Sequence, residues 1–337
     1  LLIFVLQSAS AAFTPTFQAT IPDVLPDEKE YTRALSLSRL AYDLESVVSP
    51  MLAAALLTVI SFHNLFAGTV VGFLISAALV VSVVLPSPKP AQPRSIYDRT
   101  TRGVRIYLAT PRLRGLLAIN MAVAAAGALV IVNTVVYVQA TFGLGQRDTA
   151  LALAAFGGGS MLVALVLPRL LESIPDRTAM LAGASALAIA TIAAAAMPSY
   201  GWLLALWFII GAGYSMAQTP SGRLLRRSSH AEDRPALFAA QFALSHACWL
   251  ITYPLAGWAG VAFGLPETAI ILGIVAGSAV ATAAWLWPAS DPDVVEHSHN
   301  GLPSTHSHWE QGLVNGRNTH AHAYVIDDLH DSWPHAR

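Results

Sequence analysis

The sequence predicts an all-α protein that crosses a lipid membrane several times. Of its 337 residues, 55% are hydrophobic and only 12% are charged. A soluble domain uses about 25% charged residues to cover its surface. The apolar residues also gather in runs of about 20, the length at which a helix spans the hydrocarbon core of a bilayer. Because lipid offers no hydrogen-bond partners to an open backbone, we expect these runs to be helices.

Nine stretches have this character, and together they cover most of the chain. They are residues 1–20, 40–61, 65–85, 115–140, 149–167, 179–197, 202–218, 238–263 and 268–287. Ala, Leu and Val dominate them, without the alternation that marks the strands of a membrane barrel. We therefore expect nine transmembrane helices.

Composition and motifs exclude several classes of protein. A net charge of −1 gives no basic field for nucleic acid, and the single cysteine, Cys248, excludes an internal disulfide framework. No HExxH, CxxC or nucleophile–base motif occurs, so we expect neither an enzyme nor a bound cofactor. The run Gly157-Gly158-Gly159-Ser160 has no following lysine and lies inside an apolar stretch. It therefore predicts close helix packing and not a phosphate loop.

Basic residues occupy alternate connections between the stretches. Residues 29–39, 89–114, 169–177 and 223–234 hold most of them, whereas the other connections hold only Arg147. The excess of basic residues in cytoplasmic loops places the first set in the cytoplasm, together with the C-terminal tail. With nine spans, Leu1 then lies on the outer side, which indicates an odd number of preceding helices.

A weak internal repeat predicts how many helices precede. Thr14-Pro15 closes the first stretch and is followed by a basic loop and a helix with Pro50; Thr219-Pro220 closes the seventh stretch and is followed by a basic loop and a helix with Pro254. Pairing them makes the first stretch the fourth helix of a six-helix unit. We therefore expect nine of twelve helices in two parallel repeats. The expected division is residues 1–86 (partial N-terminal half), 87–114 (central cytoplasmic loop), 115–288 (C-terminal half) and 289–337 (tail).

Residues 8–57, SASAAFTPTFQATIPDVLPDEKEYTRALSLSRLAYDLESVVSPMLAAALL, resemble the fourth helix, cytoplasmic loop and fifth helix of bacterial major facilitator exporters. Ile21-Pro22-Asp23 keeps the loop pattern, and Ser49-Pro50 stands at the Gly-Pro step of the fifth helix. Asp176-Arg177 stands where the family repeats its Asp-Arg loop. The resemblance implies a two-half helical bundle in the bacterial cytoplasmic membrane and proton-coupled transport of a solute by an antiporter.

Ionisable and polar residues inside the stretches are the candidate transport residues, because they are costly in a membrane. Glu45 has no local base and is the first coupling candidate; Asp43 either couples transport or forms an i,i+4 salt bridge with Arg39. Histidine as a residue type titrates in the useful range, so we expect His246 to carry a proton or contact substrate; the alternative is a neutral histidine bonded to a neighbouring helix. Gln241 lies on the same stretch, and Asn133 either lines a cavity or bonds another helix.

The tail holds three His-x-His pairs, and side chains at i and i+2 of an extended chain point the same way. The pairs are His297 and His299, His306 and His308, and His320 and His322. Imidazole without thiolate suits Ni²⁺, Co²⁺, Cu²⁺ or Zn²⁺. We expect the tail, from Ala289 onward, to be largely disordered. The alternative to metal binding is a solubilising polar tail with incidental histidines. The apolar residues 325–333 either dock on the cytoplasmic face or are disordered. A His-rich tail of this kind is similar to that of major facilitator nickel-resistance exporters.

These observations predict a secondary active transporter that exports a small solute. The first expected substrate is a divalent transition-metal ion such as nickel, and protons are the expected coupling ion. One alternative is an exporter of drug-like or metabolite molecules with a metal-buffering tail, which a roomy, oily cavity would favour. Another is a membrane receptor or scaffold that transports nothing. The lipid bilayer is the expected partner in every case.

Overall fold

A computed structural model of the chain describes residues 2–84, 95–299, 307–310, 313–314 and 319–334. Each of the nine predicted stretches contains one long helix. They are α1 (Leu2–Val24), α2 (Glu28–Leu56), α3 (Phe62–Ser82), α5 (Pro111–Val135), α6 (Gln146–Leu170), α7 (Asp176–Ala193), α8 (Tyr200–Gln218), α10 (Arg234–Ala262) and α11 (Leu265–Leu286). A mostly helical membrane protein is therefore confirmed.

Within the described part of the chain, six helical segments are long and apolar enough to cross a membrane, and not nine. They are α3, α5 with the π-helix η1 (Val136–Thr141), α6, α8 with the short α9 (Ser221–Arg227), α10 and α11. The other three expected spans, α1, α2 and α7, do not meet this requirement of length and composition. Charged side chains such as Glu28, Lys29 and Glu30 open α2, and Asp176 with Arg177 opens α7.

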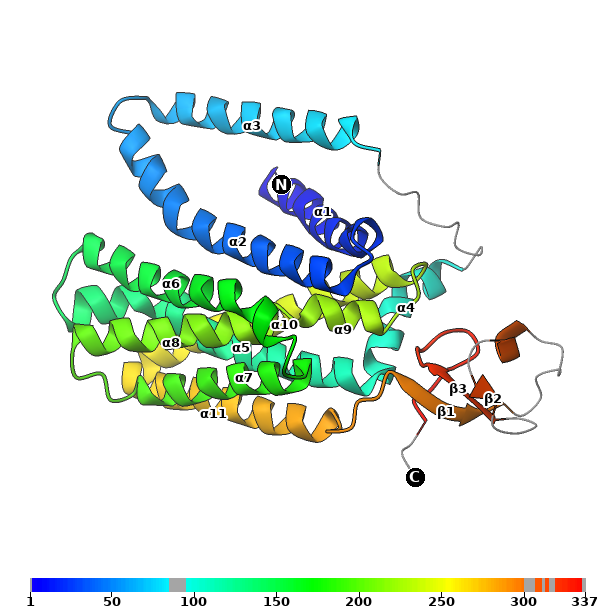
Figure 1. Cartoon of the computed structure of the whole chain (residues 1–337). Helices are drawn as coiled ribbons and strands as arrows, with labels where there is room; N and C mark the ends of the chain where they lie inside the picture. Colours follow the sequence, from blue (N-terminus) through cyan, green and yellow to red (C-terminus); the bar gives the residue numbers. More distant parts are fainter. Residues whose placement is uncertain (1, 85–94, 300–306, 311–312, 315–318, 335–337) are drawn as a thin grey trace.

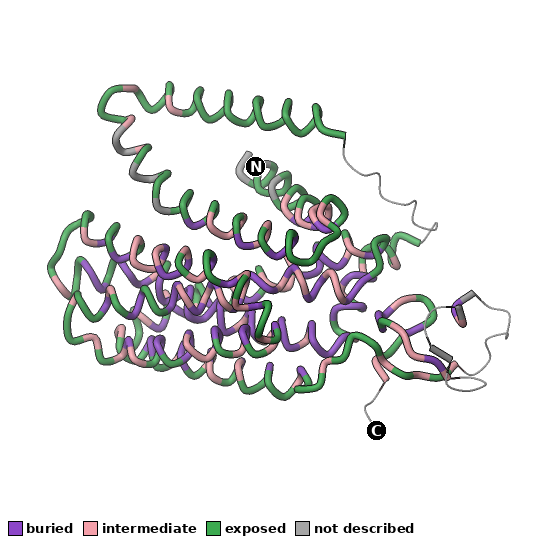
Figure 2. The backbone as a smooth tube through the Cα atoms, viewed as in Figure 1, coloured by how far each residue is buried: buried purple, intermediate pink, exposed green. Residues whose placement is uncertain are grey.

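Six helices form a closely packed bundle, α5, α6, α7, α8, α10 and α11 (Figure 1). Helix α5 is its centre, because it packs against α7, α8, α10 and α11 and buries most of its residues. The purple trace in Figure 2 follows this core along the bundle. Glycines bring two of the helices together: an added Cβ at Gly159 of α6 would collide with the backbone of Phe208 on α8. The expected packing role of the glycine run is confirmed at this position.

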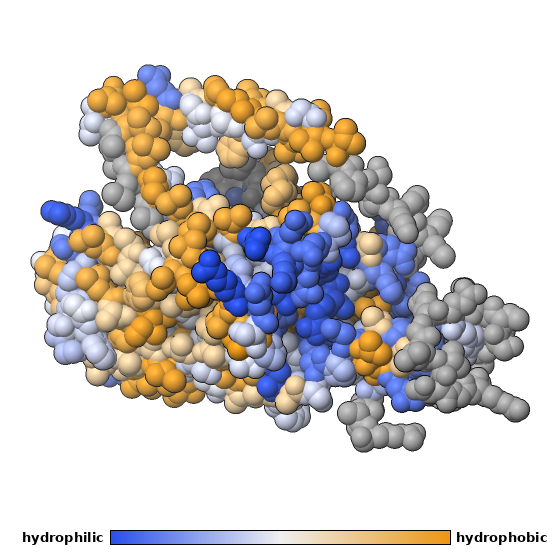
Figure 3. Space-filling model, in the orientation of Figure 1, coloured by the Kyte–Doolittle hydropathy of each residue, from blue (hydrophilic) through white to orange (hydrophobic). Residues whose placement is uncertain are grey.

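Helices α1, α2 and α3 precede the bundle and pack less closely. α2 lies along α6, and α1 contacts α10. No described residue of α3 is buried, all but Leu65 are exposed, and its surface is largely apolar (Figures 2 and 3). An apolar helix without a protein partner is compatible with lipid as its surroundings.

Two segments differ from the sequence-based expectation. α1 does not end at Thr14-Pro15 but continues through Pro15 to Val24. The central loop contains an amphipathic helix, α4 (Ile96–Ala109), which packs against α10 and buries Ile106 and Tyr107. The apolar pattern of this helix is hard to detect in the sequence, because a polar residue, Arg102, is buried on the same side as Ile106 and Tyr107.

The tail is folded where the structure describes it, so the expectation of a largely disordered tail is wrong there. Strands β1 (Val294–Ser298), β2 (Leu313–Val314) and β3 (Thr319–Ala323) form an antiparallel sheet in the order β1-β3-β2, beside the 3₁₀-helix η2 (Ser307–Glu310). The register places His297 opposite His320. Alternating histidines in two paired strands thus meet on one face, which a single-sequence pattern cannot show without the pairing.

Candidate functional site

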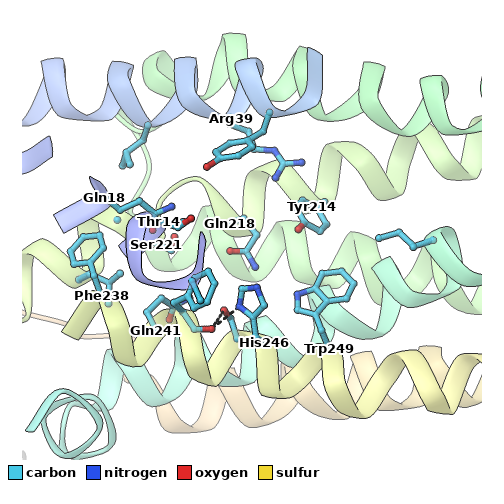
Figure 4. Close-up of a pocket in the computed structure, with 18 of the residues that line it drawn as sticks. Thr14, Gln18, Arg39, Tyr214, Gln218, Ser221, Phe238, Gln241, His246 and Trp249 are labelled. Atoms are coloured by element: carbon cyan, nitrogen blue, oxygen red, sulfur yellow. Dashed lines mark hydrogen bonds between the residues drawn. The ribbon is translucent and has the colours of Figure 1, made fainter. Parts of the chain in front are cut away.

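A cavity of about 810 Å³ lies between helices α1 and α2 on one side and α8 and α10 on the other. Arg39 and Tyr42 reach it from α2, while Gln218 and His246 reach it from α8 and α10 (Figure 4). A space of this size is within the range of small-molecule sites. It is therefore the candidate transport site.

The wall formed by α8 and α10 is mainly aromatic. The ring centroids of Tyr214 and Trp249 lie 6.5 Å apart, and those of Trp249 and Tyr253 lie 5.0 Å apart. Phe242 stacks on His246 with a centroid distance of 3.9 Å. Hydrogen-bonding side chains are also numerous in the lining, and apart from Arg39 and His246 they are amides, hydroxyls and an indole. Among the described lining residues there is no Asp, Glu or Cys.

One ion pair stands at the edge of this cavity. Arg39 binds Asp43 with an Nη2–Oδ1 distance of 2.5 Å, and its Nε also donates to Ser160 Oγ of α6 at 3.1 Å. The Arg39 guanidinium lies 4.5 Å above the centre of the Tyr214 ring, a cation–π contact. Asp43 is buried and is not among the lining residues. Its carboxylate therefore balances the one arginine of the lining.

A network of amides lies where α5, α8 and α10 meet beside the cavity. Gln218 Nε2 donates to Asn120 Oδ1 at 2.9 Å, and Gln241 Oε1 accepts from Asn120 Nδ2 at 3.4 Å. The hydroxyl of Tyr107, on α4, donates to the same Gln241 oxygen at 2.5 Å. The network links the linker helix to two lining residues, Gln218 and Gln241.

The structure brings two of the sequence-predicted transport residues to the cavity. His246 and Gln241 line it. The His246 Nδ1 contacts the Phe242 carbonyl oxygen at 2.7 Å. Because a carbonyl only accepts, Nδ1 carries a proton and donates it to this oxygen.

The other predicted transport residues lie elsewhere. Glu45 is exposed and is not among the lining residues, so the expectation that it faces the cavity is not met. Two residues along a helix turn a side chain by about 200°, and Asp43 faces α6, so Glu45 points away from it. Asn133 is buried and donates to the Ala256 carbonyl of α10 at 3.5 Å. Asp43 forms the predicted salt bridge with Arg39.

Sequence reasoning missed Arg39, Tyr214 and Gln218 as lining residues. Arg39 was placed only as the partner of Asp43, and Tyr214 and Gln218 lie in a stretch whose apolar residues face every direction. No period in that stretch distinguishes the cavity side from the other sides. Only the packing of α8 on α6 and α7 settles which side remains open.

Ion pairs join α1 and α2 to the bundle at the end where α9 and α10 begin, which we call the basic end. Arg223 binds Glu28 at 2.6 Å and Asp176 at 3.1 Å. Arg234 pairs with Asp23. The blue surface in Figure 3 shows this concentration of polar residues. Relative motion of the two sides of the cavity requires some of these contacts to break.

The second candidate site is a cluster of imidazoles in the tail, beside the basic end. Two overlapping sets of four histidines each have ligand atoms within 4.8 Å of one another. The first set is His297, His308, His322 and His330; the second is His297, His299, His308 and His320. Of the predicted ligands, His306 lies outside the described residues. His330, which was not among the predicted ligands, joins the cluster.

The pKa values of the clustered histidines are low. Burial, followed by repulsion from neighbouring imidazoles, lowers the pKa of His297 and of His308 to about 4. The same causes lower the pKa of His320 and His322. These imidazoles are therefore neutral at pH 7, the form that binds a metal ion.

The tail is held against the basic end by its acidic residues. Asp328 accepts from Arg102 of α4 at 2.6 Å, and Asp291 accepts from Arg227 at 3.1 Å. The Trp333 ring lies 5.1 Å from the Arg112 guanidinium carbon. Val325 and Ile326 are buried. Of the two interpretations of residues 325–333, the structure supports docking, not disorder.

Comparison with known families gives the cavity its context. The family model of the Major Facilitator Superfamily matches residues 1–127 and 115–316. No curated protein matches the chain. Members of this superfamily are multi-pass transporters and not enzymes, and a helical bundle with a cavity at the contact of α1 and α2 with α8 and α10 fits that description. The chain belongs to the Major Facilitator Superfamily.

Proposed function

We propose that the protein is a proton-coupled exporter of an organic solute that carries an aromatic or other apolar group. The observation that carries this proposal is the lining of the cavity, with its aromatic wall, its neutral amides and a volume of about 810 Å³. Aromatic and amide side chains recognise rings and hydrogen-bonding groups. The proposal adopts the alternative of an exporter of drug-like or metabolite molecules, which a roomy cavity with an aromatic wall favours.

The same lining argues against a metal ion as the solute in this cavity. A site for Ni²⁺ or Co²⁺ needs several imidazole, carboxylate or thiolate ligands. His246 is the one such side chain among the described lining residues. The one arginine of the described lining, Arg39, has no acceptor atom and so supplies no metal ligand.

We infer that the proton is carried at the cavity by His246 or by Asp43. His246 lines the cavity with an imidazole, a side chain that can both accept and donate a proton. Asp43 touches the cavity only through Arg39, so its protonation would release the guanidinium for a solute. The basic end faces the cytoplasm in this proposal, as the alternation of basic connections predicts.

Efflux of a divalent metal ion is the second candidate, and the histidine cluster is the observation that favours it. Six described imidazoles lie close together at the basic end. In that case the tail captures the ion and passes it to the bundle. The absence of carboxylates from the described lining makes this the weaker of the two proposals.

Everted membrane vesicles that contain the full chain test the proposal. A respiratory substrate acidifies the lumen, and a pH-sensitive acridine dye reports proton release when a transported compound is added. Aromatic carboxylates and aromatic amines are compared with Ni²⁺ and Zn²⁺. We expect an aromatic compound to release protons, and His246→Ala to weaken its apparent affinity at least several-fold.

Glu45→Gln is the matched control, because Glu45 lies on α2 but not on the cavity. It should release protons as the unmodified protein does. Proton release by Ni²⁺ or Zn²⁺ and by none of the aromatic compounds would reject the organic solute and favour metal efflux.

A further inference from the structure

Three histidines of the tail are oriented by hydrogen bonds from their Nδ1 atoms. His297 Nδ1 contacts the Val295 carbonyl at 3.0 Å, His322 Nδ1 the Ala323 carbonyl at 2.8 Å, and His330 Nδ1 the Asp327 carboxylate at 2.8 Å. Each oxygen accepts, so each Nδ1 carries a proton. The ring nitrogen left for a further contact in each of these histidines is Nε2.

These Nε2 atoms lie close together inside the cluster. His330 Nε2 and His320 Nε2 each lie 3.1 Å from His297 Nε2. His322 Nε2 is buried and has no hydrogen-bond partner among the described atoms. A buried acceptor without a donor is costly. A cation inside the cluster would give His322 Nε2 a partner and would replace the contacts between ring nitrogens.

The geometry suits a late first-row transition metal. Together with His308, these three rings form a set of four whose ligand atoms lie within 4.8 Å of one another. Metal–nitrogen bonds of about 2.0–2.1 Å in a tetrahedron place the nitrogens about 3.4 Å apart. The His297–His330 separation of 3.1 Å is close to that value, so small side-chain movements complete the site.

One ligand of this set is connected to the transporter through a carboxylate. Asp327 Oδ1 accepts from His330 Nδ1, and Asp327 Oδ2 lies 3.3 Å from Nε2 of His230, in the connection between α9 and α10. A carboxylate behind a metal-bound histidine fixes the orientation of the ring. Burial of Asp327 opposes its ionisation, but the hydrogen bonds from His230 and His330 lower its pKa, so it is a carboxylate at neutral pH.

The next tail residue makes a parallel connection. Asp328 binds Arg102 of α4, and Arg102 also binds Asp233, the residue before α10, with an Nη2–Oδ2 distance of 2.8 Å. The Arg102 side chain is 9% exposed and that of Asp233 is 5% exposed. The tail thus holds the linker helix and the start of α10 together. α10 carries the cavity residues Gln241 and His246.

We propose that the tail contains a regulatory site for one divalent transition-metal ion, held by His297, His308, His322 and His330, and that metal binding locks the α9–α10 connection through Asp327 and His230. The bound ion fixes His330, His330 fixes Asp327, and Asp327 fixes His230. Motion of α10 against α4 then costs more, so metal slows the exchange between cavity conformations. The effect on transport rests on the proposed function, whereas the site and the locked connection do not.

Hydrogen exchange of the full chain in nanodiscs tests the proposal without any transport substrate. Zn²⁺ and Ni²⁺ are the probes, Mg²⁺ is the control ion, and titration calorimetry gives the affinity. We expect Zn²⁺ to bind saturably at micromolar concentration or below, and to slow amide exchange in residues 228–237 about tenfold, within the usual range of coupling between sites.

Four variants distinguish the loss of metal binding from the loss of coupling between the metal site and α10. His322→Ala should weaken binding at least tenfold. Asp327→Asn, behind the ligand, should weaken it about 10–100-fold. His230→Gln should bind Zn²⁺ within about threefold of the unmodified protein, yet lose the protection of residues 228–237, as a coupling lost at one contact requires. His63→Gln, at the start of α3, should change neither property.

Two results would overturn the proposal. Without saturable binding of Zn²⁺ or Ni²⁺ at micromolar concentration, there is no metal site. If Zn²⁺ binds but leaves exchange in residues 228–237 unchanged, or still protects them in His230→Gln, the site is not coupled to α10. Neither result touches the proposed transport of an organic solute, which the vesicle experiment decides separately.

Discussion

A methyl group added at Gly211 has no room between α6 and α8. An ideal Cβ at this position would stand 2.7 Å from the carbonyl carbon of Phe156. The ordinary contact distance between carbon atoms is about 3.5–4.0 Å. The obstacle is helix backbone and cannot rotate aside as a side chain would. Gly211→Ala therefore forces the two helices apart by about 1 Å.

Two opposing effects decide the size of the change in stability. Overpacking a well-packed interior costs about 1–3 kcal/mol, and a clash with backbone belongs at the upper end. Replacing glycine by alanine inside a helix contributes about 1 kcal/mol in the other direction. The net loss is about 2 kcal/mol, which lowers the midpoint of thermal unfolding by about 4–8 °C for a chain segment of 150–250 residues.

Thermal unfolding of the purified protein in detergent, followed by tryptophan fluorescence, measures this effect. Gly158→Ala is the matched control, because its Cβ would meet the Phe208 ring at 3.9 Å, an ordinary contact. It should leave the midpoint unchanged or raise it slightly. Equal midpoints for Gly211→Ala and Gly158→Ala would refute the close approach of α6 and α8.

Three further predictions follow from the other contacts. Asp43→Asn should destabilise the protein because it leaves the Arg39 guanidinium without its carboxylate, and a double-mutant cycle with Arg39→Gln should give an interaction energy of about 0.5–3 kcal/mol; strict additivity would contradict the ion pair. In the packed tail, without metal, the pKa values of His297 and His308 are about 4. In the unfolded tail, histidine pKa values are about 6.5, so the unfolded tail binds protons first as the pH falls. The packed tail is therefore stable above about pH 6.5 and loses stability between about pH 6.5 and pH 4, and limited proteolysis should cut it faster at pH 5 than at pH 7.5; equal rates, measured against the protease's own pH dependence, would contradict the packed cluster. Asp23→Asn should weaken the contact of α1 with Arg234 at the basic end and speed hydrogen exchange in residues 20–30, whereas unchanged exchange would show that the pair does not hold the two sides together.

Hydrophobic run length predicted the helices because a membrane imposes the same requirement on every spanning segment. The backbone N–H and C=O groups must be hydrogen-bonded within the segment, and the side chains facing lipid must be apolar. Each of the nine predicted stretches contains a helix. The boundaries differed where polar residues continue a helix beyond the apolar run, as in α2, which begins at Glu28 and not near Leu40. The amphipathic α4 was missed for the same reason, since apolar run length does not detect a helix that is half polar.

The candidate sites were less predictable, because they depend on which helix faces which. His246 and Gln241 were identified from their polarity inside an apolar stretch, and both line the cavity. The same polarity rule selected Glu45 and Asn133, which lie off the cavity. In the tail, the histidine pattern predicted ligands in local pairs, but the strand pairing mixes the pairs and adds His330 from 33 residues beyond His297.

The central claim is that the cavity binds an organic solute, and equilibrium binding to the purified chain in nanodiscs tests it most directly. Titration calorimetry with the aromatic compound that releases protons in vesicles should show saturable binding to the unmodified protein and to Glu45→Gln. Binding should weaken at least several-fold in Trp249→Leu and His246→Ala, whose side chains line the cavity. Equal affinity in all four proteins would place the solute outside the cavity and contradict the account.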